Sequence, residues 1–529
     1  MIRVQMEFYK DAMHVWRHFM ARLAGDEDIA PFTPAPRDKR FKSEVWDKNP
    51  LFDLIKQSYL MVNHWAQEQL DSAHGLDNSA RKRLDFYMQQ YLDALAPTNF
   101  LLTNPDALNL TLESNGANLV RGLQNLRDDL ARSSGVFQVS STDKNAFAVG
   151  KNLATTPGKV VYQNDLVQLI QYSPQTEKVF QVPVLIIAPW INKYYILDLQ
   201  PENSLIRWLV EQGYTVFVTS WVNPGPGLAN KRFEDYLREG VLETLNAVQK
   251  ATGETQVNMV GYCIGGTLLA TALAWLKAKG RDKEVRSATY LTTLLDFCDP
   301  GDISVFVDEV QLSELEEKMN ERGYMDSSEM SAVFSALRAN DMIWSFVVNN
   351  YLMGNEPFAF DLLYWNADST RLPAAMQSFY LRNMYLQNKL IRAGGITLDG
   401  VPIDLHTVTT PSYMLSTIDD HIAPWKTTYR AMHIFKGPLR FVLSGSGHVG
   451  GVVNPPSRMK YGYWTNPDCQ ADADAWLKNA MKAEGSWWKD WHRWLQTEGY
   501  AGKKVSARIP GKGVLNALED APGSYVKVK

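Results

Sequence analysis

The spacing of apolar residues divides the chain into two parts near residue 150. In the first part, apolar side chains recur at intervals of three and four residues, as at Phe52, Ile55, Tyr59, Val62 and Ala66. This spacing places them on one face of a helix, and Pro50 marks its start. Two more helices are predicted over residues 80–95 and from Pro105 through Leu130. We therefore expect residues 1–150 to form a helical N-terminal domain.

The pattern changes at about Val160, where short β-rich apolar runs begin to alternate with amphipathic helices. Residues 160–162 and 166–172 flank Gln163-Asn164-Asp165, which predicts a hairpin. Further strands are predicted over residues 182–188, 216–221, 257–260, 289–295, 413–417 and 439–443. Strands that alternate with helices form crossover units in a mostly parallel sheet. We expect residues 151–529 to form one α/β domain.

The alternation stops between Leu295 and Pro411. This segment of more than a hundred residues has helix-like patterns and many aromatic side chains. An insertion at this place in the sheet is expected to lie over the active site as a helical cap, at about residues 298–405, and to exclude water. An ordinary helical subdomain with its own core is the alternative, and the two interpretations are compatible.

One stretch, Met259 to Leu276, combines a strand, a sharp turn and a helix without a single charged residue. Cys263 lies on the turn, and Gly261 and Gly265 flank it. This arrangement is typical of the nucleophile elbow of the α/β hydrolases, where small residues allow the helix to pass close to the sheet. The backbone N–H of Ile264, at the helix start, is expected to face the site where an oxyanion forms.

Two simpler interpretations of this stretch are open. Its 18 residues are long enough for a transmembrane helix, but three glycines in the first eight residues and the β-like beginning argue against a membrane span. Cys263 is alternatively a buried structural cysteine, since free cysteines are among the most buried residues. A catalytic role for Cys263 therefore requires partners elsewhere in the chain.

Two later loops offer such partners, in the chain order nucleophile, acid, histidine. Residues 418–425 and 444–451 each follow a predicted strand, at the sheet edge where parallel sheets carry their chemistry. His448 is the preferred base because the glycines on both sides of it let the ring approach the sulfur. His421 is adjacent to the acid and is more simply structural. The candidate acids, in order of preference, are Asp420, Asp419 and Asp296.

Composition excludes several other classes of protein. The 529 residues carry a formal net charge of −4 with 21% charged residues, which gives no reason to expect nucleic-acid binding. Three scattered cysteines are too few for a disulfide framework or a four-ligand zinc site. The first twenty residues lack the unbroken apolar run of a signal peptide. We expect a cytoplasmic protein without a bound metal.

Six motifs, read together, resemble one family, the polyhydroxyalkanoate synthases. They are GYCIGG at 261–266, PWINKYYILDLQPENSL at 189–205, TSWVNPG at 219–225, LTTLLDF at 291–297, DDHIAPW at 419–425 and SGHVGGVVNPP at 446–456. The form of the first motif is similar to that of the class I, single-subunit enzymes. The resemblance implies Cys263 as nucleophile, Asp420 as acid and His448 as base.

The resemblance also implies an activity. These enzymes polymerise (R)-3-hydroxyacyl-CoA, for this form 3-hydroxybutyryl-CoA, into a polyester and release coenzyme A. It further implies a homodimer attached to the polymer granule in the cytoplasm, with no cofactor and no transmembrane segment. A second oxyanion donor is expected from Ile191, in the loop after the strand at 182–188, and Trp190 and His421 are candidate substrate-binding residues. Lys193 is either a contact for the CoA phosphates or a structural lysine.

Two other functions are kept as alternatives. An acyl-CoA thioesterase or esterase on the same fold would pass the acyl group to water. A non-catalytic granule-binding protein would use its aromatic surface, to which 16 tryptophans contribute, as a hydrophobic patch.

Overall fold

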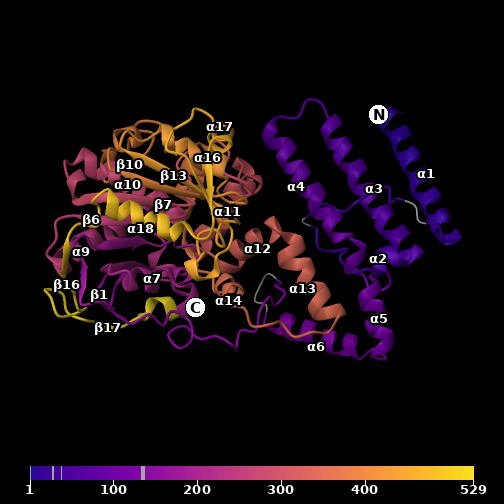
Figure 1. The fold of residues 1–529 in the computed structure, drawn as a ribbon, viewed down its shortest axis with the longest axis horizontal. Coiled ribbons are helices and arrows are strands. Elements are labelled where there is room, and N and C mark those ends of the chain that lie inside the picture. The colour runs from indigo at the N-terminus through magenta and orange to yellow at the C-terminus, as the bar shows by residue number, and fades with distance from the viewer. Residues whose placement is uncertain (1, 27–28, 37, 133–136) are drawn as a thin grey trace. The chain divides into compact units, whose positions relative to one another are not determined.

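The computed structural model describes residues 2–26, 29–36, 38–132 and 137–529 (Figure 1). The chain forms two compact units. The N-terminal unit contains Met1–Asp143 and Ala332–Ala359, and the sheet unit contains Lys144–Ser331 and Phe360–Lys529. The first boundary lies at residue 143, where about 150 was expected, and residues 332–359, which were expected in the cap, group with the N-terminal helices.

The N-terminal unit is helical. Its main helices are α1 (Ile2–Ala24), α2 (Val45–Lys48), α3 (Pro50–Ser72), α4 (Asn78–Ala94), α5 (Pro105–Glu113) and α6 (Ala117–Arg132). α3 begins at Pro50 as predicted, because the Asn49 side chain accepts hydrogen bonds from the first backbone N–H groups. The single helix predicted from Pro105 through Leu130 is wrong. Asn115 and Gly116 adopt positive φ angles of 50° and 82°, which end α5 and start α6 in a new direction.

The segment 332–359 is held against α6. It contains the end of α12 (Ser327–Leu337), the short α13 (Ser345–Val347) and π-helical turns on both sides of α13. The Asn118 side chain donates a hydrogen bond to the carbonyl O of Leu352 at 2.7 Å. Tyr351 donates its hydroxyl to Asp129 at 2.7 Å. A Cβ atom at Gly122 would collide with the carbonyl O of Tyr351, so glycine permits the close packing of the two backbones.

The sheet unit is built on one mixed sheet of eleven strands, in the order β15-β14-β13-β12-β7-β6-β4-β5-β2-β1-β17. The central strands are β4 (Val184–Ile187), β5 (Val216–Trp221), β6 (Val257–Tyr262), β7 (Val285–Leu291), β12 (Ser412–Thr417) and β13 (Leu439–Ser444). These six pair in parallel. The parallel arrangement predicted from the sequence is therefore confirmed for the centre of the sheet.

Antiparallel strands extend the sheet at both edges. They are β1 (Gly158–Gln163), β2 (Val167–Tyr172), β14 (Tyr463–Thr465), β15 (Met481–Ala483) and β17 (Glu519–Asp520). β1 and β2 are the predicted hairpin. The lysines after Gly502 suggest a solvated tail, but the structure makes these residues part of the fold. β16 (Lys504–Ser506) pairs with β3 (Lys178–Phe180), and Val526 is buried.

The helices that cover the sheet are α7 (Leu205–Glu211), α9 (Glu243–Thr252), α10 (Ile264–Ala278) and α18 (Trp487–Thr497) (Figure 1). α18 carries four tryptophans, and all four are buried: Trp487, Trp488, Trp491 and Trp494. The indole N–H groups of Trp487 and Trp488 donate to the carbonyl oxygens of Gly451 and Val452, each at 2.9 Å. α18 thus anchors the loop after β13. Among the described residues, no helix has the length and apolar character that a membrane span requires.

Candidate active site

The turn between β6 and α10 presents Cys263. Its backbone has φ 52° and ψ −122°, a conformation that a residue with a Cβ rarely adopts. The Cys263 N–H donates to the carbonyl O of Leu291 at 2.8 Å, and its own carbonyl O accepts from Gly266 N–H at 2.9 Å. These bonds hold the strained turn. Ile264 is the first residue of α10, and backbone N–H groups in the first turn of a helix have no intrahelical acceptor.

The glycines beside Cys263 are required by close packing. A Cβ at Gly261 would collide with the Cα of Gly266, and one at Gly265 would collide with the carbonyl O of Ile187. Gly265 therefore lets the start of α10 rest on the end of β4. The sequence predicted small residues here for this reason.

The loops after β12 and β13 bring Asp420 and His448 together. His448 Nδ1 lies 2.7 Å from Asp420 Oδ2, and both side chains are buried. The other carboxylate oxygen, Oδ1, accepts hydrogen bonds from the N–H groups of Ile422 at 2.9 Å and Ala423 at 2.8 Å. With both oxygens engaged, Asp420 fixes the ring orientation of His448.

His448 lies within electrostatic reach of Cys263, so the structure places the three residues predicted from the sequence near one another. Because Nδ1 is bonded to Asp420, Nε2 is the ring nitrogen that is left to interact with Cys263. Burial lowers the pKa of His448, but the negative charges of Asp420 and Cys263 and its hydrogen bonds to both outweigh it, and the pKa is raised well above its usual value. The ring of Tyr262 stacks on the imidazole with centroids 5.8 Å apart.

The last part of the cap segment also lines the site. Tyr380 ends α15 (Ala374–Tyr380), Tyr385 lies in the following π-helix Leu381–Leu386, and their ring centroids are 5.6 Å apart. Both rings pack on Phe297, at 6.1 and 5.1 Å. Burial and then the charge of Cys263 raise the pKa of Tyr385, with a further contribution from Asp420. The Tyr385 phenol therefore lies within electrostatic reach of both groups.

In the sequence, Tyr380 and Tyr385 stand out only as members of an aromatic segment. Their separation of five residues does not fit the face of an α-helix, but a π-helix has i to i+5 hydrogen bonds and a different register. To predict that the two tyrosines lie together, one would have had to recognise the π-helical turn in the sequence.

The other candidate acids lie elsewhere. Asp296 pairs with Arg430 Nε at 2.7 Å and accepts from Asn388 Nδ2 at 2.7 Å. These contacts link the loop after β7 to the last part of the cap segment and to the short helix that begins at Arg430. Asp419 donates its N–H to the carbonyl O of Ser446 at 3.0 Å, which joins the two site loops. The carbonyl O of His421 accepts from Asp302 N–H at 2.9 Å, at the start of the cap segment.

The loop after β4 holds the remaining predicted residues. Trp190 is buried against Trp221 and Tyr236, with ring centroids 5.6 and 4.9 Å away. The carbonyl O of Ile191 accepts from the Thr370 hydroxyl at 2.8 Å. β4 pairs with β6 up to Ile187 and Gly261, so this loop and the elbow leave the same end of neighbouring strands.

The contacts of the Lys193 side chain do not agree with a role in binding the CoA phosphates. Its side chain is 3% exposed and forms an ion pair with Asp368 at 2.8 Å. It also donates to the carbonyl O of Val528 at 3.1 Å. Burial lowers the pKa of Lys193, against the opposing charge of Asp368. These contacts favour the structural alternative for Lys193.

The sheet order and the cysteine elbow define an α/β hydrolase fold, and the profile described as "alpha/beta hydrolase fold" matches residues 183–455. The profile described as "Poly-beta-hydroxybutyrate polymerase (PhaC) N-terminus" matches residues 37–209. The poly(3-hydroxyalkanoate) polymerase of Methylorubrum extorquens is 47% identical over 529 residues, which are 100% of this chain and 87% of the relative. The chain belongs to the poly(3-hydroxyalkanoate) polymerase family, which confirms the predicted resemblance and the predicted fold class.

A second full-length relative is similar to the same extent. The poly(3-hydroxyalkanoate) polymerase subunit PhaC of Rhizobium meliloti is 49% identical over 515 residues, 97% of this chain and 84% of the relative. A solved meta-cleavage product hydrolase from Pseudomonas fluorescens shares 12% identity with a TM-score of 0.31, and the match covers 57% of this chain and 92% of that structure.

Proposed function

We propose that this protein polymerises (R)-3-hydroxyacyl-CoA into polyhydroxyalkanoate and releases coenzyme A through a cysteine-bound acyl intermediate. The observation that carries the proposal is the strained turn that presents Cys263 near His448, whose Nδ1 is bonded to Asp420. The names of the full-length relatives supply the substrate class. By the resemblance stated above, the substrate is short-chain, with 3-hydroxybutyryl-CoA as the first one to test.

In the proposed acylation step, the Cys263 sulfur attacks the thioester carbonyl and its proton passes to Nε2 of His448. The carbonyl oxygen becomes an oxyanion, for which the N–H groups of Ile264 and Ile191 are the proposed donors. Each such donor is worth about 3–4 kcal/mol. The intermediate collapses with cleavage of the bond to the CoA sulfur, and CoA leaves with the proton from His448.

In the elongation step, the acyl group passes from Cys263 to a hydroxyl. His448 accepts the proton of the 3-hydroxyl group as its oxygen attacks the acyl carbonyl. An ester bond forms, and the thiolate of Cys263 leaves and recovers a proton from His448. Asp420 orients the imidazole in both steps, because its two oxygens are held by His448 and by backbone N–H groups.

Two features favour polymerisation over hydrolysis. Transfer from the CoA thioester to Cys263 makes a second thioester of similar energy, so the acyl-enzyme keeps the driving force needed for ester formation. Tyr380 and Tyr385 lie close to Cys263, and exclusion of water on this side of the site would protect a reactive acyl intermediate. We further propose that the enzyme needs no cofactor and acts as a homodimer at the granule surface in the cytoplasm, on the family resemblance alone.

The decisive experiment is incubation of the full chain with (R)-3-hydroxybutyryl-CoA. We expect stoichiometric release of CoA together with an insoluble polyester. Soluble 3-hydroxybutyrate in place of polymer would identify a thioesterase. Granule binding without release of CoA would identify a non-catalytic granule protein.

A further inference from the structure

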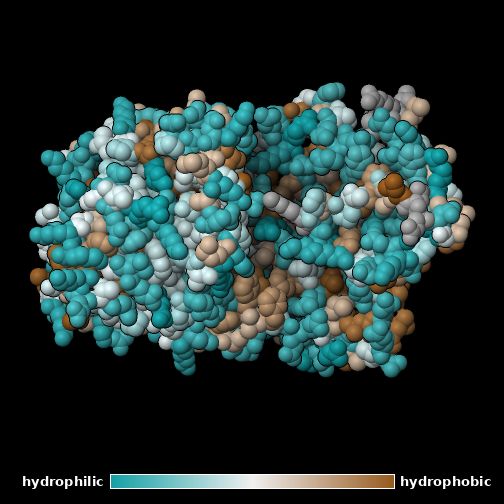
Figure 2. All heavy atoms as spheres, viewed as in Figure 1, coloured by the Kyte–Doolittle hydropathy of each residue, from teal (hydrophilic) through white to brown (hydrophobic). Residues whose placement is uncertain are grey.

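The outer side of α1 carries an exposed apolar seam. Its members lie at alternating intervals of three and four residues and are between 49% and 71% exposed. They are Met6, Tyr9, Met13, Trp16, Met20 and Leu23. This spacing corresponds to the a and d positions of a heptad repeat, the pattern of a coiled-coil seam. Figure 2 shows hydrophobic residues exposed on the N-terminal unit.

The seam is not needed to hold α1 in place. The opposite side of α1 packs on α3, where Val15 is buried and the Phe8 ring lies 5.5 Å from the Trp65 ring. His18 Nε2 lies 2.8 Å from Asp53 Oδ2, and both groups are buried. α1 therefore has one face packed on its own unit and a second apolar face that the described residues of this unit leave exposed.

The narrow width of the seam favours a helix as its occupant. A strict a and d pattern covers a narrower stripe than the face of at least about 100° that a helix buries against a broad apolar surface. One flank carries the charged residues Lys10 and Arg17, and a partner helix can place complementary charges directly against them. A second helix meets the two apolar rows and leaves the flanks in water.

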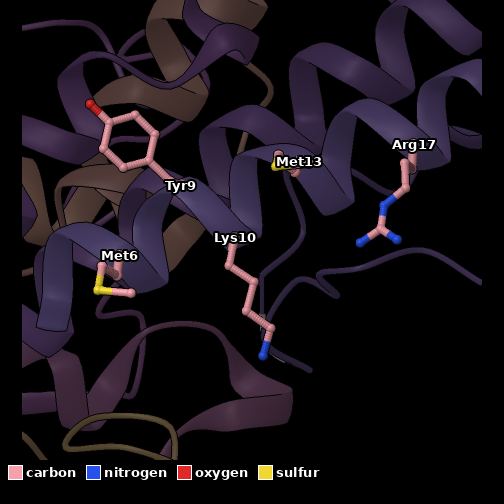
Figure 3. A pocket seen from close by; sticks show the side chains of 5 residues that line it. All are labelled: Met6, Tyr9, Lys10, Met13 and Arg17. Carbon is pink, nitrogen blue, oxygen red and sulfur yellow. The ribbon is translucent and has the colours of Figure 1, made fainter.

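The charges beside the seam indicate which kind of helix it binds. Lys10 and Arg17 occupy successive e positions, and together with Met6, Tyr9 and Met13 they line a groove of about 410 Å³. Figure 3 shows the two basic side chains extending from the same side of α1. The other flank carries no charge. Its residues are Gln5, Ala12 and Phe19.

A second copy of α1 does not fit these charges. In an antiparallel pair, e positions face e positions, which would bring Lys10 and Arg17 against basic residues. In a parallel pair they would face the uncharged flank. Charged pairs across e and g positions set partner choice in coiled coils. A complementary helix therefore carries acidic residues beside its apolar rows.

We propose that the α1 seam docks an amphipathic helix of another protein, with apolar residues at a and d and Glu or Asp on the flank that meets Lys10 and Arg17. Met residues at the a positions suit such a groove because their side chains adapt to the partner. The proposed interaction surface is independent of the enzymatic activity.

The test uses two fluorescein-labelled helical peptides with the same Leu seam, one flanked by Glu and one by Lys. Each is titrated with the full chain at low salt, and fluorescence anisotropy gives the Kd. We expect the Glu-flanked peptide to bind about ten-fold more tightly, since two attractive pairs replace two repulsive ones. Lys10→Glu with Arg17→Glu should reverse this preference. Met13→Glu with Trp16→Glu should abolish binding of both peptides.

A matched control is available on α6, where Val120 and Leu123 are also exposed and three residues apart. Val120→Glu with Leu123→Glu should leave binding and the helical circular dichroism unchanged. Equal binding of the two peptides, or binding that survives Met13→Glu with Trp16→Glu, would overturn the proposal. Self-association, or binding to phosphatidylglycerol vesicles, that is lost in the same variant while neither peptide binds would assign the seam to a second copy or to a lipid surface instead.

Discussion

At the scale of single residues, the chemistry depends on a buried imidazole that lies between a carboxyl group and a thiol. Asp420 is bonded to Nδ1 of His448, and Cys263 lies close enough to influence the same ring. Replacing any one of these three side chains by a similar one without its charge or its contact changes where the proton lies, with little change in packing. The residue variants below are therefore expected to fold.

Cys263→Ser is expected to keep the fold and to lose nearly all polymerisation, by about three orders of magnitude or more, as for other enzymes that lose their nucleophile. The hydroxyl is a far weaker nucleophile than the thiolate. Release of CoA, followed with a thiol reagent, measures the loss, and circular dichroism reports the fold. A near-normal rate of CoA release would exclude Cys263 as the nucleophile.

His448→Gln is expected to block acylation itself, because the thiol then has no base. Intact-mass spectrometry after brief incubation with a saturated acyl-CoA analogue measures the acyl-enzyme. We expect a mass increase in the parent protein and none in this variant. Substantial trapping of the acyl-enzyme by His448→Gln would remove His448 from the role of base.

The raised pKa of His448 also predicts how stability depends on pH. A group whose pKa is higher in the folded state stabilises the fold fully below its unfolded pKa, about 6.5, and loses this contribution as the pH rises through the folded value. The difference in urea midpoint between the parent protein and His448→Gln should therefore be largest near pH 6 and shrink steadily toward alkaline pH. A difference that grows with pH would contradict the direction of the shift.

At the scale of elements, the corner between β6 and α10 depends on the absence of a side chain. Gly265→Ala would drive a Cβ into the carbonyl O of Ile187, a backbone atom that cannot rotate away. We expect destabilisation of about 1–3 kcal/mol in urea unfolding, together with lower activity. Gly227→Ala is the control, because a Cβ there meets open space. Equal stability of the two variants would show that the corner between β6 and α10 tolerates the added Cβ.

The elements differ in how well the sequence predicts them. The central strands were predictable because they are short apolar runs buried on both faces, and His448 and Asp420 because each follows such a run. The break at Asn115 was missed because helical spacing continues on both sides of it. The pairing of the C-terminal strands and the π-helical turn that orients Tyr385 depend on contacts distant in sequence, which periodicity does not encode.

At the scale of the whole molecule, the insertion between β7 and β12 contributes to both units. Residues 332–359 pack with α6, whereas Tyr380 and Tyr385, from the same insertion, line the site in the sheet unit. The predicted cap is therefore continuous in sequence, but its residues belong to two different compact units. Helical patterning could not reveal this, because it shows which face of a helix is apolar and not what covers that face.

Gly122→Ala tests this division of the insertion. Its Cβ would collide with the carbonyl O of Tyr351, so we expect α6 and the segment 348–352 to separate at a cost of about 1–3 kcal/mol. Hydrogen–deuterium exchange should accelerate over residues 117–132 and 340–359 and stay unchanged over 257–278, because the elbow belongs to the other unit. Leu123→Ala, at an exposed neighbouring position on the same helix, should change neither region. Faster exchange at the elbow as well would show that the two units unfold as one body.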